Sequence, residues 1–165
     1  MEDYFTAMKT VGGLLLVLTW FSLAAAADKT RDLQGDDIRE AVFRWQFGNN
    51  ASYHQNDRNY AQVYFLQVND RDPSEKLMKR FANHKPPVRK VSACGPERIK
   101  GVYDKKTGEK GLIFRVTTIK WSSETEAEVD GGYHEHGLSA SGNTYTLKKE
   151  NGKWKVTKDK MHWIS

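Results

Sequence analysis

Two hydrophobic patterns divide the chain. In DDIREAVFRWQFG (36–48), apolar residues recur at the i, i+3, i+4, i+7 spacing of one helical face. These residues are Ile38, Ala41, Val42 and Trp45. From residue 88 onward, apolar residues occur in short runs or alternate with polar ones between turn residues, which is typical of strands. The patterning predicts helix first and then a sheet.

The ends of the first helix are marked by residue type. Asp37 and Glu40 resemble a capping box at its start, and Gly48 is a suitable stop. Phe43 and Phe47 widen the apolar face, so we expect the helix to be well buried.

A strand and a second helix are predicted next. AQVYFLQV (61–68) is a short apolar run rich in strand-forming residues. Asp72 as N-cap and Pro73 at the first helical position then predict a helix, with Glu75 in its first turn. Leu77, Met78 and Phe81 would form its buried face, and Pro86-Pro87 would end it.

The remaining segments predict strands joined by short turns. VRKVSAC (88–94) is the first, and residues 99–103 and 111–121 flank a turn with Gly108 in the left-handed position. The last strands follow at 125–136 and in TYTLKK and KWKVTKDKMHWI, the final pair joined at Asn151-Gly152. Four such strands form an antiparallel meander. The fold class predicted is α+β, with N-terminal helices packed on a curved antiparallel sheet.

The N-terminal segment is predicted to lie outside this domain. Residues 11–23 form an apolar run of 13, too short for a comfortable membrane span, and small residues follow it. This is the pattern of a signal peptide (1–27) cleaved near Ala26 or Ala27. A flexible segment (28–35) and a single domain (36–165) follow, so the expected location is secreted or periplasmic, with no membrane attachment after cleavage.

Composition and charge agree with a single globular domain. Hydrophobic residues make up 38% and charged residues 28% of 165. Removal of residues 1–27 takes away one lysine and two acidic residues, so the net charge rises from +5 to +6. Lysines alternate with core-facing residues such as Trp154, which indicates a solvated sheet face and not a nucleic-acid surface. Cys94 is the only cysteine, so no intramolecular disulfide forms, and we expect it to be a small buried residue.

The C-terminal third resembles a known superfamily. The strand Tyr145 to Lys149, the turn Asn151-Gly152, the run Lys153-Trp154-Lys155-Val156 and the closing Trp163-Ile164 are similar to the nuclear transport factor 2-like superfamily, which includes SnoaL-like and ketosteroid-isomerase-like domains. Within this superfamily, the chain most resembles small secreted bacterial proteins. The resemblance implies a cone, a curved sheet wrapped around helices with a pocket at its wide mouth. The chain departs from the family in having less N-terminal helix and an early strand.

The strand predicted from TEAEVDGGYHEHG (125–137) carries two of the five histidines. Side chains alternate between faces along a strand. One face would hold Ala127, Val129, Gly131 and Tyr133, and the other Glu126, Glu128, Asp130, His134 and His136. A bulge at Gly131-Gly132 would invert this order and turn both histidines inward. The sequence leaves both arrangements open.

The final strand has a comparable ambiguity. Trp154 and Val156 share one phase, whereas Met161 and Trp163 share the opposite one. A shift within residues 157–160 would reconcile them, with Met161 and Trp163 pointing inward and His162 outward. Histidines divided in this way argue against a three-histidine metal centre.

The candidate chemistry follows from these placements. Tyr145, Trp121, Trp163 and Met161 are the expected lining of a pocket suited to a small apolar ligand. The first hypothesis is a secreted, non-catalytic binding or interaction module without a cofactor. The alternative is a SnoaL-like isomerase, dehydratase or hydrolase, with a general base and a proton donor in the pocket. Its candidates are His134, His136, Tyr133, Tyr145, Glu135 and Asp130.

Two further alternatives concern metals and partners. No metal site is expected, but the H-x-H pair His134 and His136 has the geometry of two zinc ligands and is the alternative. Look-alikes often form homodimers through the open face of the sheet, so the resemblance implies the same pairing here.

Overall fold

A computed structural model of the chain describes residues 34–49, 61–95 and 101–165. Two compact units divide the chain, Met1–Gly35 and Asp36–Ser165. The expected signal peptide, residues 28–33 and the loop at 50–60 lie outside the described residues. Gln34 and Gly35 are helical, which differs from the flexible segment expected over 28–35. No helix in the described ranges has the length and apolar character needed to span a membrane.

Residues 34–49 form the long helix predicted from the apolar spacing. Ile38, Val42 and Phe43 are fully buried, as expected. The helix already includes residue 34, so Asp37 is not its N-cap, and it continues through Gly48 to residue 49. The carboxylates of Asp37 and Glu40 instead pair with Arg80 Nη1 at 2.7 and 2.9 Å.

The second predicted helix is shorter and starts later. Helix α2 is Glu75–Lys79, and its N-cap is Ser74, whose Oγ accepts from Leu77 N at 3.1 Å. The prediction of Asp72 as N-cap is therefore wrong. The Asp72 carboxylate accepts a hydrogen bond from Ser92 N at 2.8 Å. This bond links the segment before α2 to the 3₁₀ turn after β2.

The segment between α2 and the meander contains little regular structure. Strand β2 (Val88–Lys90) covers three residues of the strand predicted over 88–94, and a 3₁₀ turn, η1 (Val91–Ala93), follows. Only isolated bridges form around the next turn, so the described part of 99–103 is not a strand. Gly108 has φ +76, the left-handed conformation predicted for it.

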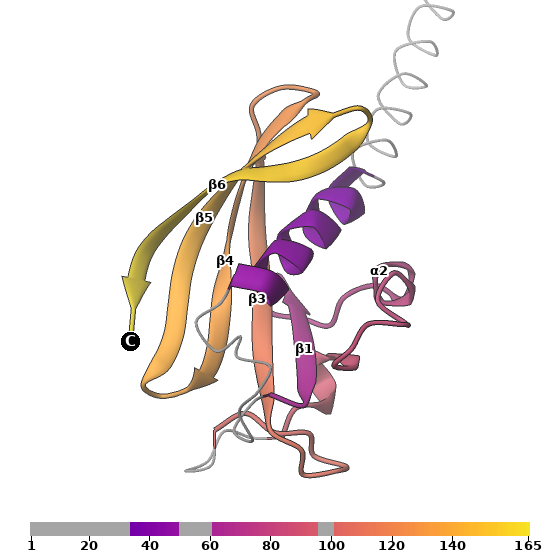
Figure 1. Ribbon diagram of the computed structural model, residues 1–165, viewed down its shortest axis with the longest axis vertical. Coiled ribbons are helices and arrows are strands. Elements are labelled where there is room, and N and C mark those ends of the chain that lie inside the picture. The colour runs from indigo at the N-terminus through magenta and orange to yellow at the C-terminus, as the bar shows by residue number, and fades with distance from the viewer. Residues whose placement is uncertain (1–33, 50–60, 96–100) are drawn as a thin grey trace, which may run out of the picture. The chain divides into compact units, whose positions relative to one another are not determined.

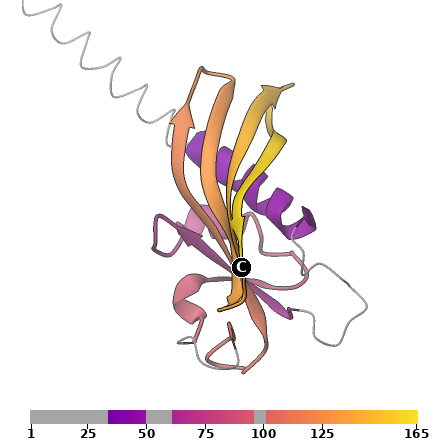
Figure 2. The ribbon, with the colours of Figure 1, turned by 90° about the vertical axis from the view of Figure 1, so that its left-hand side faces the viewer.

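The sheet is mixed and has six strands in the order β2-β1-β3-β4-β5-β6 (Figure 1). Strand β1 (Val63–Val68) runs parallel to both neighbours. Strands β3 (Gly111–Trp121), β4 (Glu126–His136), β5 (Ser139–Glu150) and β6 (Lys153–Ile164) pair antiparallel in chain order. The fold is α+β, and the 34–49 helix lies against one face of the sheet (Figure 2).

Extra residues on single strands bend this sheet. The pairing slips within β3 between Val116 and Ile119, and within β4 between His134 and His136. Strand β6 has two slips against β5, at Thr157 and at His162. Each inserts one residue, which bends the strand and reverses the face of the residues beyond it. A shift was expected between residues 157 and 160, and Thr157 is where the first occurs.

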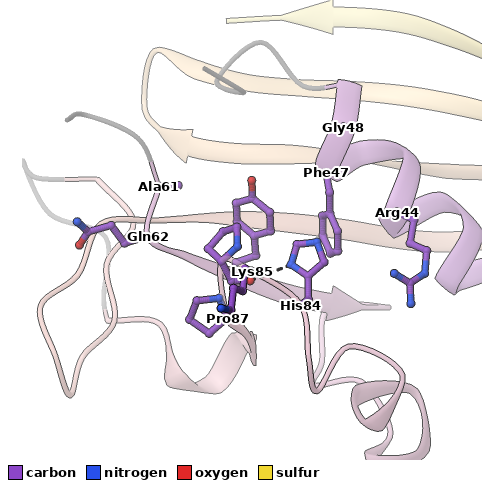
Figure 3. Close-up of a pocket in the computed structure, with 10 residues that line it drawn as sticks. Arg44, Phe47, Gly48, Ala61, Gln62, His84, Lys85 and Pro87 are labelled. Atoms are coloured by element: carbon purple, nitrogen blue, oxygen red, sulfur yellow. Dashed lines mark hydrogen bonds between the residues drawn. The ribbon is translucent and has the colours of Figure 1, made fainter. Parts of the chain in front are cut away.

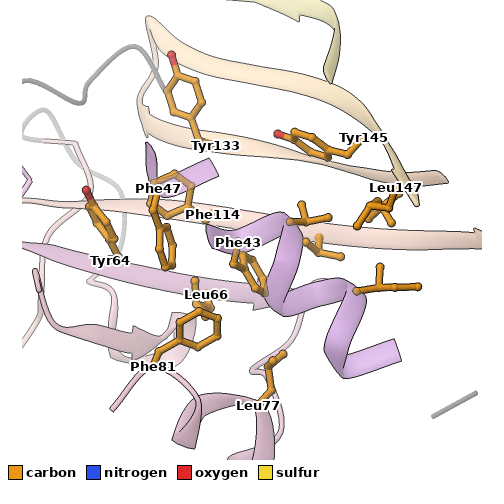
Figure 4. Close-up of a cluster of buried hydrophobic side chains, with 14 of the residues drawn as sticks. Phe43, Phe47, Tyr64, Leu66, Leu77, Phe81, Phe114, Tyr133, Tyr145 and Leu147 are labelled. Atoms are coloured by element: carbon orange, nitrogen blue, oxygen red, sulfur yellow. The ribbon is translucent and has the colours of Figure 1, made fainter. Parts of the chain in front are cut away.

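The main core lies between the 34–49 helix and the sheet (Figure 4). Phe47 and Tyr64 contact Phe114 with ring centroids 5.0 and 4.9 Å away. Among the described residues, a second cluster covers the outer sheet face near β1, where Phe65 and Val63 pack with Val102. Cys94 is half-buried beside this second cluster.

Candidate functional site

The histidine-bearing strand keeps the simple alternation as far as His134. Gly131 and Gly132 pair with consecutive β5 residues, so no bulge occurs there. Tyr133 is buried in the core on the helix side, with Ala127 and Val129. His134 lies on the opposite face. The extra residue is Glu135, between the two histidines, so His134 does not turn inward and the two histidines do not share a face.

The candidate acid and base groups of β4 are spread over different surroundings. Glu135 pairs with Lys110 Nζ at 2.8 Å and accepts from Ser139 Oγ at 3.1 Å. His136 Nδ1 accepts from Leu138 N at 3.2 Å in the turn to β5. Tyr133 is in the core, so these groups do not converge on one substrate position. Among the described residues, no three histidine, cysteine or acidic side chains are arranged to hold a metal ion.

Asp130 lies on the outer sheet face. Its Oδ1 accepts from Thr144 Oγ1 at 2.7 Å, and its Oδ2 pairs with Lys120 Nζ at 3.3 Å. The Thr144 hydroxyl lowers the pKa of Asp130, burial opposes this, and Lys120 and His162 add to the lowering. The carboxylate is therefore ionised near neutral pH and is better suited to accepting hydrogen bonds than to general acid chemistry.

The four expected pocket residues separate into three places. Tyr145 and Met161 line a small cavity of about 60 Å³ on the helix side. Trp163 lies beyond the second β6 slip and lines a hollow on the outer face. Trp121 packs edge-on against Trp154, with ring centroids 5.6 Å apart, at the far end of the sheet. The expectation that Trp163 points inward with Met161 is wrong, because His162 is an additional bulge residue.

Polar side chains beside the small cavity are hydrogen-bonded to one another and to the backbone. Gln46 Nε2 donates to Tyr145 Oη at 3.1 Å and to the Arg115 carbonyl at 3.1 Å. Asn143 Nδ2 donates to Asp159 Oδ1 at 2.6 Å, and Trp45 Nε1 donates to Asp159 Oδ2 at 3.0 Å. Burial raises the pKa of Tyr145, so its hydroxyl keeps its proton at physiological pH. About 60 Å³ holds one or two waters and not a drug-sized ligand.

A much larger hollow, of about 840 Å³, lies where the 34–49 helix ends beside β1 (Figure 3). We call it the helix-end hollow. Its lining includes three rings, those of Phe47, Tyr64 and His84. His84 lies 4.7 Å from Phe47 and 5.7 Å from Tyr64 between ring centroids. The rings come from three separate segments and form one apolar floor.

His84 is held in place by the chain that follows it. Its Nδ1 lies 2.8 Å from the Pro86 carbonyl oxygen. A carbonyl only accepts hydrogen bonds, so Nδ1 carries the proton. In the neutral ring Nε2 is then an acceptor, and the ring orientation is fixed against Phe47.

Two cations lie at the rim of the helix-end hollow, Arg44 and Lys85. Arg44 Nε donates to Glu40 at 2.9 Å, and Arg44 Nη2 donates to the Arg80 carbonyl at 3.1 Å. Its guanidinium also lies 5.1 Å above the Phe81 ring. These contacts hold the guanidinium, which is ion-paired with Glu40, beside the apolar floor. Lys85 adds a second, exposed positive charge.

Sequence reasoning did not identify this site. The sequence predicts Phe47 on the buried face of the helix and HKPP as the end of the second helix. The available signal was the concentration of one histidine, one lysine and two prolines between a helix and a strand, because such connections often carry binding residues. Comparison with known proteins finds no matching family model, no significantly similar curated protein and no significantly similar solved structure.

Proposed function

We propose that the protein is a secreted, non-catalytic binding module that takes a small ligand in the helix-end hollow. The observation that carries this proposal is a hollow of about 840 Å³ with a three-ring floor and two cations at its rim. Its volume is in the range of small-molecule sites. An apolar floor beside positive charge suits a ligand with a planar apolar body and an acidic group.

The probe 1-anilinonaphthalene-8-sulfonate has this combination, and its uncharged analogue N-phenyl-1-naphthylamine is the matched comparison. We expect the sulfonate to bind one-to-one, because the naphthalene enters the aromatic-lined hollow while the sulfonate meets Lys85 and Arg44. Lys85→Gln should weaken sulfonate binding about fivefold, equivalent to about 1 kcal/mol for an exposed ion pair. Isothermal titration calorimetry measures both ligands.

The control variant is Lys153→Gln, which removes an exposed lysine at the start of β6. It should leave both affinities unchanged, and Lys85→Gln should leave the uncharged analogue unchanged. If Lys85→Gln and the unaltered protein bind the sulfonate with equal affinity, Lys85 does not contact the ligand as proposed. Failure of both probes to bind would contradict the site. Near-ultraviolet circular dichroism shows that each variant is folded.

Secretion is the second part of the proposal, and the apolar run at 11–23 followed by small residues supports it. We expect the protein recovered from the medium or periplasm of an expressing cell to begin near Ala27 or Asp28. N-terminal sequencing and intact mass measure this directly. Recovery of the chain with residues 1–27 still attached to the membrane fraction would contradict cleavage.

We also propose that the chain is a reduced member of the nuclear transport factor 2-like superfamily, with a cone formed by the bent meander and the 34–49 helix. The antiparallel order of β3 to β6 and the position of Lys153-Trp154-Lys155-Val156 in the last strand support this. A crystal structure tests it by superposition on a SnoaL-like domain. Agreement limited to the meander, with the helix crossing elsewhere, would count against the proposal.

A further inference from the structure

The outer face of the sheet carries a row of four residues across four strands. Arg115 of β3 pairs with Gly132 of β4, Gly132 with Gly142 of β5, and Gly142 with Trp163 of β6. Gly131 faces the helix, since a Cβ on it would meet Gln46 and Tyr145. Gly132 therefore faces outward. The two glycines leave a strip of bare backbone between Arg115 and Trp163, which we call the glycine trough.

Trp163 forms one wall of the trough. A Cβ added to Gly142 would lie 2.2 Å from Trp163 Nε1, so the indole rests directly on this glycine. Covering this glycine of β5 uses one side of the indole ring. The residue remains 49% exposed, so part of the indole is open to solvent. An indole fixed against backbone is a preorganised stacking surface.

Hydrogen-bonding groups lie along one side of the trough. Thr144 Oγ1 donates to Asp130 Oδ1 at 2.7 Å and lies 2.8 Å from His162 Nε2. Since the threonine proton goes to Asp130, His162 Nε2 donates to Thr144. These three side chains, Arg115 and Trp163 line one hollow of about 290 Å³. Asp70 lines it as well, so the site combines an aromatic surface, a guanidinium, two carboxylates and a fixed imidazole.

The dimensions favour a single ring as occupant. Three strand spacings separate the Arg115 and Trp163 backbones, or roughly 14 Å. The indole occupies the space above Gly142, and the hollow has the Arg115 side chain at one end and Trp163 at the other. A ligand there would be stacked on one side and ion-paired on the other.

We propose that the glycine trough binds a saccharide ring that bears a carboxylate, a uronic acid residue. The apolar C–H face of the sugar stacks on Trp163, because the indole face is electron-rich. The sugar carboxylate pairs with Arg115 in the two-pronged geometry that guanidinium favours. Asp130 and His162 form hydrogen bonds with the hydroxyl groups of the sugar. A net charge of +6 after signal removal also attracts an acidic glycan.

This site is separate from the helix-end hollow, and its test does not depend on that proposal. The probe is hyaluronan tetrasaccharide, which contains glucuronic acid, and the neutral comparison is N-acetylchitotetraose. We expect the hyaluronan fragment to shift the Trp163 indole and Gly132 and Gly142 amide signals in ¹H–¹⁵N spectra of the labelled protein. Trp163→Ala should weaken this binding about tenfold through lost stacking.

Arg115→Gln separates charge recognition from stacking. It should weaken hyaluronan binding about tenfold and leave chitotetraose binding unchanged. Leu138→Ala, at a residue 82% exposed in the β4–β5 turn, is the control and should change neither. Absence of shifts at millimolar concentrations of both sugars would overturn the proposal, as would equal affinity for the two. If Trp163→Ala loses its dispersed spectrum, Arg115→Gln still decides the question.

Discussion

Replacing Phe114 with alanine is expected to lower the free energy of unfolding by about 4 kcal/mol, a typical cost for a fully buried phenylalanine. Phe114 is fully buried in the middle of β3. Its ring meets Phe47 of the long helix and Tyr64 of β1 at centroid distances of 5.0 and 4.9 Å. Truncation would remove the contact that joins three elements at once and leave a cavity that aromatic neighbours fill poorly.

Urea unfolding followed by circular dichroism measures this loss as a shift in midpoint at constant slope. Phe114→Leu keeps most of the volume and should cost about 1 kcal/mol. Leu138→Ala, at an exposed turn residue, should stay within about 0.5 kcal/mol of the unaltered protein. A Phe114→Ala midpoint as close to the unaltered protein as that of Leu138→Ala would show that the helix does not pack on β3 as described.

Elements with a strong local period were predictable from the sequence. The i, i+3, i+4, i+7 spacing around Val42 gave the long helix, and the apolar run at 61–68 gave β1. The Asn151-Gly152 signal gave the β5–β6 hairpin, where both residues have positive φ. Each of these depends on residues close in sequence, so local physics suffices.

Features that depend on the partner strand were not predictable. Whether β4 bulges at Gly131 or at Glu135 is decided by its pairing with β3 and β5. The second slip of β6, at His162, moved Trp163 to the outer face, and no residue near it marks that position. The N-cap of α2 moved from Asp72 to Ser74 because Asp72 has a better partner in Ser92, 20 residues away.

The same distinction applies to the candidate sites. Of the expected pocket lining, only Tyr145 and Met161 share a cavity. The β6 slip at Thr157 puts Met161 on the same sheet face as Tyr145, and the slip at His162 puts Trp163 on the opposite face. The helix-end hollow depends on three segments meeting, and the glycine trough on the register of four strands. Neither has a local signature. The expected homodimer through the open sheet face stays a prediction, and the trough occupies part of the same surface.

Replacing Asp104 is expected to cause the second-largest loss in the free energy of unfolding. Its side chain is fully buried, Oδ2 pairs with Arg89 Nη1 at 2.8 Å, and Oδ1 accepts from the amides of Lys106 and Thr107 at 2.8 and 3.0 Å. Asp104→Ala should lower the free energy of unfolding by about 3 kcal/mol, because Arg89 and both turn amides lose their acceptor. Asp104→Asn keeps an acceptor for the amides but not the charge, so its loss should be smaller.

The pH dependence separates the charge from the shape of Asp104. Burial would raise the pKa of Asp104, but the Thr107 and Lys106 amides and Arg89 outweigh it, so the folded pKa is lower than the unfolded value of about 3.9. A lowered folded pKa contributes stability that is present above the unfolded pKa and is lost as pH falls through the folded one. The difference in free energy of unfolding between the unaltered protein and Asp104→Asn should therefore be largest near pH 7. It should become smaller in acid. Urea unfolding at pH 7 and in acid measures this difference. The control is Glu126→Gln, which removes an exposed ion pair with Lys148 and should leave the urea midpoint unchanged. A difference that is constant or larger in acid would mean that the Arg89 contact does not stabilise the folded state.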